Sequence, residues 1–99
     1  MVKHLIIWNL KDELSDEEKK SVKEKIKSGL ESLNGKIPGM KELTIRTDFL
    51  EGSNGDILLD GTFEDEKALE GYQKNPLHLK EAAVVKQNVK SRKCVDFEI

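Results

Sequence analysis

The chain has 99 residues, of which 36% are hydrophobic and 36% are charged, with a formal net charge of −2. Because typical globular proteins have about 25% charged and about 45–50% apolar residues, this chain is rich in charge and has few core residues for the one domain, residues 1–99, that its length allows. The balanced charge argues against nucleic acid as the main partner, no apolar run approaches the roughly 18 residues of a membrane span, and the single Cys94 excludes an intrachain disulfide.

Residues 2–10 are predicted to form a strand with apolar side chains on both faces. One face carries His4, Ile6 and Trp8, and the other carries Leu5 and Ile7. A strand that is apolar on both faces is generally buried on both faces. We therefore expect other parts of the protein, or a second subunit, to cover each side of this strand.

The next predicted element is a helix that begins after Ser15. Ser15 and Glu18 form a capping-box pattern, which satisfies free amides at a helix start. Apolar residues then recur at helical spacing, namely Val22, Ile26, Leu30, Leu33 and Ile37. The intervening lysines and glutamates are typical of a solvated helix face. We predict that the helix ends near Gly35, before Pro38 and Gly39.

Two strands are predicted in the middle of the chain, over residues 42–50 and 57–64. Apolar side chains alternate with polar ones along the first of them. The connection at residues 52–56 contains Asn54-Gly55, which is a strong hairpin signal. The two strands are therefore expected to pair as an antiparallel hairpin.

Two helices and a last strand complete the chain. Asp65 is a predicted cap for a short helix whose inward face carries Ala68, Leu69 and Tyr72. Asn75-Pro76 ends this helix and begins another, which runs to about Asn88. Residues 91–98 alternate as a strand.

The order of elements, strand-helix-strand-strand-helix-strand, is typical of an α+β, ferredoxin-like βαββαβ protomer with an antiparallel sheet. Right-handed crossovers place the helices on one face of this sheet. Leu5 and Ile7 lie opposite His4, Ile6 and Trp8, and Leu58 lies opposite Ile57 and Leu59. Whichever set faces the helices, large apolar side chains remain for the other face. We predict that a second copy of the chain covers that face, which gives a homodimeric α/β barrel.

Four polar residues occupy positions where the apolar pattern predicts inward-facing side chains: His4, Tyr72, His78 and Asp96. Each has a structural explanation, because an inward Tyr or His is usually a hydrogen-bonded core residue and a strand Asp is often a charge partner. Buried polar groups are unfavourable unless they are paired, so four of them at inward positions also point to a functional site. The structural and the functional interpretations are about equally supported.

The position of His78 has a chemical consequence. It lies in the first turn after Asn75, where the positive end of the helix disfavours a protonated imidazole. A nearby carboxylate such as Asp96 would work in the opposite direction. A neutral imidazole can act as a general base, and a phenol such as Tyr72 can donate to a carbonyl or enolate oxygen. The set suits proton abstraction next to a carbonyl.

Several segments of the chain resemble the stress-responsive dimeric A/B barrel (Dabb) family over essentially the whole length. These segments are Val2–Trp8, Leu10–Glu13, Ile37–Met40, Phe63–Asp65, Tyr72–His78 and Val95–Phe97. The resemblance implies a ferredoxin-like protomer in a homodimeric barrel. This sequence departs from the family pattern at Asn75, where the family often has a histidine that could act as a base.

The olivetolic acid cyclase-like members of the family close poly-β-keto thioesters by aldol condensation. Likeness to them implies that His78 is the base and Tyr72 the oxygen-binding partner, in a pocket between the helices and the sheet. The remaining predicted pocket residues are His4, Asp96, Trp8, Ile26 and Leu59. The first helix lacks the aromatic residues of the cyclase, since Val22, Lys23 and Ile26 stand there.

Three hypotheses follow. In the first, the homodimer has a small hydrophobic pocket that binds a carbonyl-containing metabolite and converts it by His/Tyr acid-base chemistry. In the second, it is a non-catalytic, stress-associated dimer with a structural or ligand-binding role. In the third and least favoured, His4, His78 and Asp96 form a metal site. We expect a cytoplasmic protein with no cofactor, metal, nucleic-acid partner or membrane association.

Overall fold

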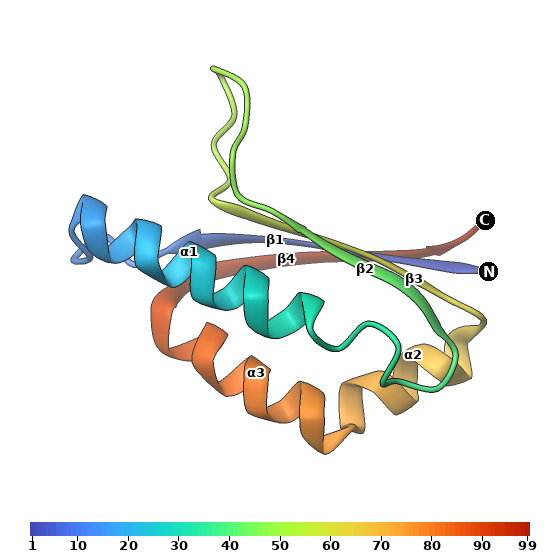
Figure 1. Ribbon diagram of the computed structural model, residues 1–99. Coiled ribbons are helices and arrows are strands. Elements are labelled where there is room, and N and C mark those ends of the chain that lie inside the picture. Colours follow the sequence, from blue (N-terminus) through green and yellow to red (C-terminus); the bar gives the residue numbers. More distant parts are fainter.

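The computed structural model describes residues 1–99 as a four-stranded antiparallel sheet with three helices. The elements are β1 (Val2–Leu10), α1 (Asp16–Glu31), β2 (Met40–Arg46), β3 (Ile57–Phe63), α2 (Glu66–Lys74), α3 (Pro76–Asn88) and β4 (Val89–Glu98). The strand order is β2-β3-β1-β4, and all neighbours are antiparallel. All three helices lie on one side of the sheet (Figure 1). The predicted ferredoxin-like α+β protomer is confirmed.

None of the helices combines the length and apolar character that a membrane crossing requires.

The predicted helix caps are present and fix where the helices begin. The Ser15 hydroxyl accepts from the Glu18 amide, and the Glu18 carboxylate accepts from the Ser15 amide. Asp65 caps α2 in the same sense. Asn75 ends α2 with its backbone amide and begins α3 with its side chain, which accepts from the Leu77 amide. This double cap places His78 in the first turn of α3.

The connection between β2 and β3 differs from the prediction. β2 ends at Arg46, and residues 47–56 form a long loop that projects away from the helices (Figure 1). Leu50 is 87% exposed. The Asn54-Gly55 segment does not close a tight hairpin because it is held by β1: Asn9 donates to the Asn54 carbonyl, and the Asp56 amide donates to the Trp8 carbonyl. These contacts join residues at least 45 positions apart in the chain, so local sequence patterns do not reveal them.

The first helix also ends earlier than predicted, at Glu31 rather than near Gly35. The next turns are tightened by bonds between residues three apart, such as Leu33 to Leu30. The Asn34 side chain then binds both the amide and the carbonyl of Leu43 in β2. The α-helix ends at Glu31 because the residues that follow it, above all Asn34, form hydrogen bonds with β2. The last strand also begins two residues before the predicted 91–98.

The hydrophobic core lies between the helices and the sheet. Alternate residues of β1 are all buried against the helices, namely Val2, His4, Ile6, Trp8 and Leu10. The opposite face of the sheet is open in the single chain, and it carries Ile7, Val95 and Phe97 at 48%, 59% and 44% exposure. Within one chain, β1 is therefore covered on one face only.

Candidate functional site

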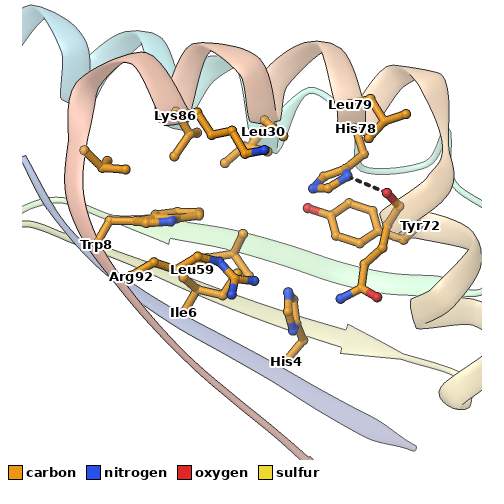
Figure 2. Close-up of a pocket in the computed structure, with 14 residues that line it drawn as sticks. His4, Ile6, Trp8, Leu30, Leu59, Tyr72, His78, Leu79, Lys86 and Arg92 are labelled. Carbon is orange, nitrogen blue, oxygen red and sulfur yellow. Dashed lines mark hydrogen bonds between the residues drawn. The ribbon is translucent and has the colours of Figure 1, made fainter.

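A cavity of about 380 Å³ lies between the helix layer and the sheet. Its walls come mainly from α3 and β1, with contributions from α1, α2, β3 and β4, and most of its lining is hydrophobic (Figure 2). The polar lining residues are His4, Tyr72, Gln73, His78, Lys86 and Arg92. Three of the four polar residues that the apolar pattern placed inward therefore border one space.

Tyr72 brings an unpartnered hydroxyl to this cavity. The residue lies near the end of α2 and is 1% exposed, and its hydroxyl has no hydrogen-bond partner within the protein. Leaving a buried polar group unpaired costs about 1–3 kcal/mol, so the site gains when a ligand accepts a bond from it. Burial raises the pKa of the Tyr72 phenol well above its usual range, which keeps it a hydrogen-bond donor.

His78 lies beside Tyr72, with the two ring centroids 4.2 Å apart. Its Nδ1 donates to the backbone carbonyl of Gln73 at 3.3 Å, which leaves Nε2 of the neutral ring with a free lone pair (Figure 2). Burial is the main influence on the pKa of His78 and lowers it. The Gln73 carbonyl raises that pKa, whereas His4 and Arg92 lower it through their charges. The ring therefore has the form of a general base at neutral pH.

The carboxylate of Asp96 pairs with the other histidine. His4 and Asp96 face each other across β1 and β4, and His4 Nδ1 donates to the Asp96 carboxylate. His4 is 1% exposed and lines the cavity, whereas Asp96 does not line it. The sequence left open whether Asp96 would lie near His78. In the structure it orients His4, and the Gln73 carbonyl orients His78.

One cluster could hold a metal ion. His4, Cys94 and Asp96 have possible ligand atoms that all lie within 4.8 Å of one another. Cys94 Sγ is 3.5 Å from the Asp96 carboxylate and 3.8 Å from His4 Nδ1. Burial, followed by Asp96, raises the pKa of the Cys94 thiol. His78 is not part of this cluster, so the combination of His4, His78 and Asp96 considered as a metal site is not assembled.

The remaining predicted pocket residues divide into two groups. Trp8 and Leu59 line the cavity. Ile26 of α1 is 2% exposed and belongs to the hydrophobic core, but it does not line the cavity. Leu30 is the residue of α1 that does.

Sequence reasoning missed three polar lining residues, Gln73, Lys86 and Arg92. Lys86 follows Ala82 by four positions on the face of α3 that carries His78, and Arg92 follows the alternation of Cys94 and Asp96. Both periodicities were visible in the sequence. The Gln73 contact is made by its backbone carbonyl, which no side-chain pattern reveals.

These features define a ferredoxin-like α+β protein with a ligand-sized pocket between helices and sheet. The chain belongs to the Dabb family: the model of the Stress responsive A/B Barrel Domain matches residues 2–99. The family resemblance noted in the sequence is thereby confirmed. No curated protein matches the chain.

Solved structures with the same fold include several dimeric proteins. A dimeric ferredoxin-like protein of unknown function from Bacteroides fragilis is 28% identical, with a TM-score of 0.92 over 99% of this chain and 95% of that chain. A dimeric ferredoxin-like protein of unknown function from Thermobifida fusca is 21% identical, with a TM-score of 0.85 over 99% and 90%. A hydroxynitrile lyase from Passiflora edulis is 18% identical, with a TM-score of 0.79 over 99% and 92%. At such low identities, the last two establish a shared fold only.

Proposed function

We propose that the protein is a homodimer in which each protomer's cavity binds a small carbonyl-containing metabolite and converts it by acid-base chemistry. The observation that carries this proposal is the meeting, in one cavity, of the unpartnered Tyr72 hydroxyl and the His78 ring with its free Nε2. The alternative, a non-catalytic dimer, requires these groups only to hold α2 and α3 on the sheet.

The chemistry begins with the carbonyl oxygen of the ligand, which accepts a hydrogen bond from Tyr72. His78 Nε2 takes a proton from the carbon next to that carbonyl. The C–H electron pair forms a carbon–carbon double bond and the carbonyl π pair moves to the oxygen, where the Tyr72 hydroxyl stabilises the enolate. The lowered pKa of His78 keeps the base neutral, and the raised pKa of Tyr72 keeps the donor protonated. His4 lines the cavity, and its hydrogen bond to Asp96 fixes the orientation of its ring.

The size and lining of the cavity support a small, largely apolar ligand. Its volume of about 380 Å³ lies near the lower end of the roughly 300–1,000 Å³ typical of ligand pockets. Trp8, Leu30 and Leu59 provide apolar walls. The ligand is therefore a compact carbonyl compound with an apolar part, such as a short β-keto derivative.

The open face of the sheet supports the homodimer. Ile7, Val95 and Phe97 expose large apolar side chains there, and exposed apolar patches of this kind usually mark interaction sites. Two of the similar solved structures are described as dimeric. A second copy packed on this face completes the barrel and leaves each cavity on the opposite side of its own sheet.

The test measures proton abstraction directly. The protein is incubated in D2O with a panel of short β-keto thioesters and 2-oxo acids, and NMR follows deuterium uptake at the carbon next to the carbonyl. We expect wild-type protein to accelerate exchange with a panel member. His78→Ala should remove about 10²–10⁴-fold of that acceleration, the usual contribution of a general base.

Lys80→Ala is the matched control, because Lys80 is an exposed residue of α3 that does not line the cavity. It should leave exchange unchanged, and light scattering should give the mass of a dimer for all variants. Absence of exchange and binding across the panel, together with a large fall in melting temperature for His78→Ala, would favour the non-catalytic alternative.

A further inference from the structure

Two cations border the cavity without a carboxylate partner. Lys86 on α3 and Arg92 on β4 both line the pocket, and neither belongs to any of the four ion pairs of the protein. Asp96, which lies on the same face of β4 as Arg92, is engaged by His4. Only three of the 17 Lys and Arg residues take part in an ion pair, and Lys86 and Arg92 are both exposed. The feature that needs an explanation is their shared position on the wall of one largely apolar pocket.

The fold brings these two side chains to the cavity from opposite layers. Arg92 stands opposite Trp8 in the β1–β4 register, so its side chain leaves the sheet on the helix side. Lys86 lies two helical turns after His78 on α3. Figure 2 shows the charged ends of both side chains directed into the space that Trp8 and Tyr72 border.

We infer that Lys86 and Arg92 form a carboxylate-binding subsite, and that the natural ligand is an oxo acid whose carboxylate lies between them. This inference rests on the proposed function, since it names the substrate class of the same cavity. An Arg guanidinium can grip a carboxylate with two parallel bonds, and a Lys ammonium adds a third charged donor. The apolar walls hold the remainder of the acid.

This arrangement also orients the reaction. With the carboxylate at the two cations and the ketone oxygen at Tyr72, the adjacent carbon faces His78. When His78 removes the proton, the C–H electron pair forms the carbon–carbon double bond of the enolate and the carbonyl π pair moves to the ketone oxygen. The removed proton exchanges with solvent at His78, and delivery of a deuteron to the carbon restores the ketone and completes the exchange.

A carboxylate fits better than the phosphates of a carrier thioester, which would also be attracted to cations. Those phosphates are separated from the thioester by a full pantetheine arm, whereas Arg92 lines the same cavity as Tyr72 and His78. The cavity of about 380 Å³ accommodates a compact acid rather than that arm. The anion therefore belongs to the reacting molecule itself.

The test compares 2-oxohexanoate with its neutral methyl ester and with a short β-keto thioester of coenzyme A, by calorimetric titration of the full-length protein. We expect the acid to bind about tenfold or more tightly than the ester, as a charge-assisted contact should give. In Lys86→Met and Arg92→Met variants this preference should disappear. The control Lys80→Met removes an α3 charge outside the cavity and should retain it.

Deuterium exchange separates this inference from the proposed function. Loss of the two cations should raise the KM for 2-oxohexanoate more than it lowers kcat, whereas loss of His78 should lower kcat. The inference is overturned if acid and ester bind equally, if neither binds, or if only the thioester depends on Lys86 and Arg92. Exchange that depends on His78 but not on ligand charge would overturn the subsite and leave the proposed function standing.

Discussion

The two faces of the sheet are built from the same strands but differ in what they expose. Neighbouring residues of β1 show this most directly: Ile6, on the helix side, is 4% exposed, and Ile7, on the open side, is 48% exposed. The helix side holds the cavity with its buried polar groups, and the open side exposes Ile7, Val95 and Phe97 beside polar groups such as the Lys3–Asp60 ion pair. Because side chains alternate along a strand, chemistry and association can be changed independently.

The largest expected effect comes from a charge on the open face. Ile7→Asp should raise the dimer dissociation constant by about 1,000-fold or more, because it removes about 1.5–3 kcal/mol of apolar burial and places a carboxylate in the interface. Analytical ultracentrifugation over a concentration series measures this. Leu77→Asp, a change of similarly exposed apolar residue on α3, is the control and should stay dimeric. An intact Ile7→Asp dimer would contradict the assignment of this face.

The second comparison uses two adjacent alanine variants. Ile6→Ala should lower the free energy of unfolding by about 3 kcal/mol, the usual loss for truncating a buried core residue. Ile7→Ala should act mainly through dimerisation, so its effect on the unfolding midpoint should vary with protein concentration. Urea denaturation at two protein concentrations distinguishes these cases. Equal losses that do not depend on concentration would mean that the two faces do not differ in the way proposed.

A smaller effect, of opposite sign, is expected at Tyr72. Tyr72→Phe removes a buried hydroxyl that has no partner, so the free energy of unfolding should stay the same or rise by about 1 kcal/mol. Exchange activity should nevertheless fall, because the donor to the carbonyl is lost. Chemical denaturation and the D2O assay are measured on the same preparation. A clear loss of stability would indicate that the hydroxyl is bonded in solution.

The smallest effect concerns pH. Because the pKa of His78 is lowered in the folded state, the unfolded chain takes up this proton more readily below the ordinary value of 6.5. The contribution of His78 to stability is therefore full above pH 6.5 and is lost as the pH falls through the folded pKa. Urea denaturation at pH 7.5 and 5.5 should show a smaller decrease for His78→Gln than for wild type. An equal decrease in both proteins would mean that other groups account for it.

Local sequence patterns predicted most elements because their signals act over a few residues. The Ser15–Glu18 capping box and the double cap at Asn75 join atoms within four positions of one another, and both are present as predicted. The predictions failed where distant segments meet. Residues 47–50 leave the predicted strand, and the loop that follows is held to Asn9 of β1.

The candidate site shows the same division. Periodicity placed His4, Tyr72 and His78 on inward faces, and all three line the cavity. It did not predict which partner each would have. Asp96 binds His4 because the register between the first and last strands places the two residues opposite each other, although they are 92 positions apart in the chain.

Sequence patterns were enough to predict the order of elements, the caps of the helices, the inward face of β1 and membership of the Dabb family. These depend on side-chain periodicity and hydrogen bonds between near neighbours. Three features required the folded structure: the Gln73 carbonyl binds His78, the Tyr72 hydroxyl has no partner, and Lys86 and Arg92 line the same cavity. Those features arise where helices cross the sheet, because packing of distant segments sets which atoms come together and which polar groups remain unpaired.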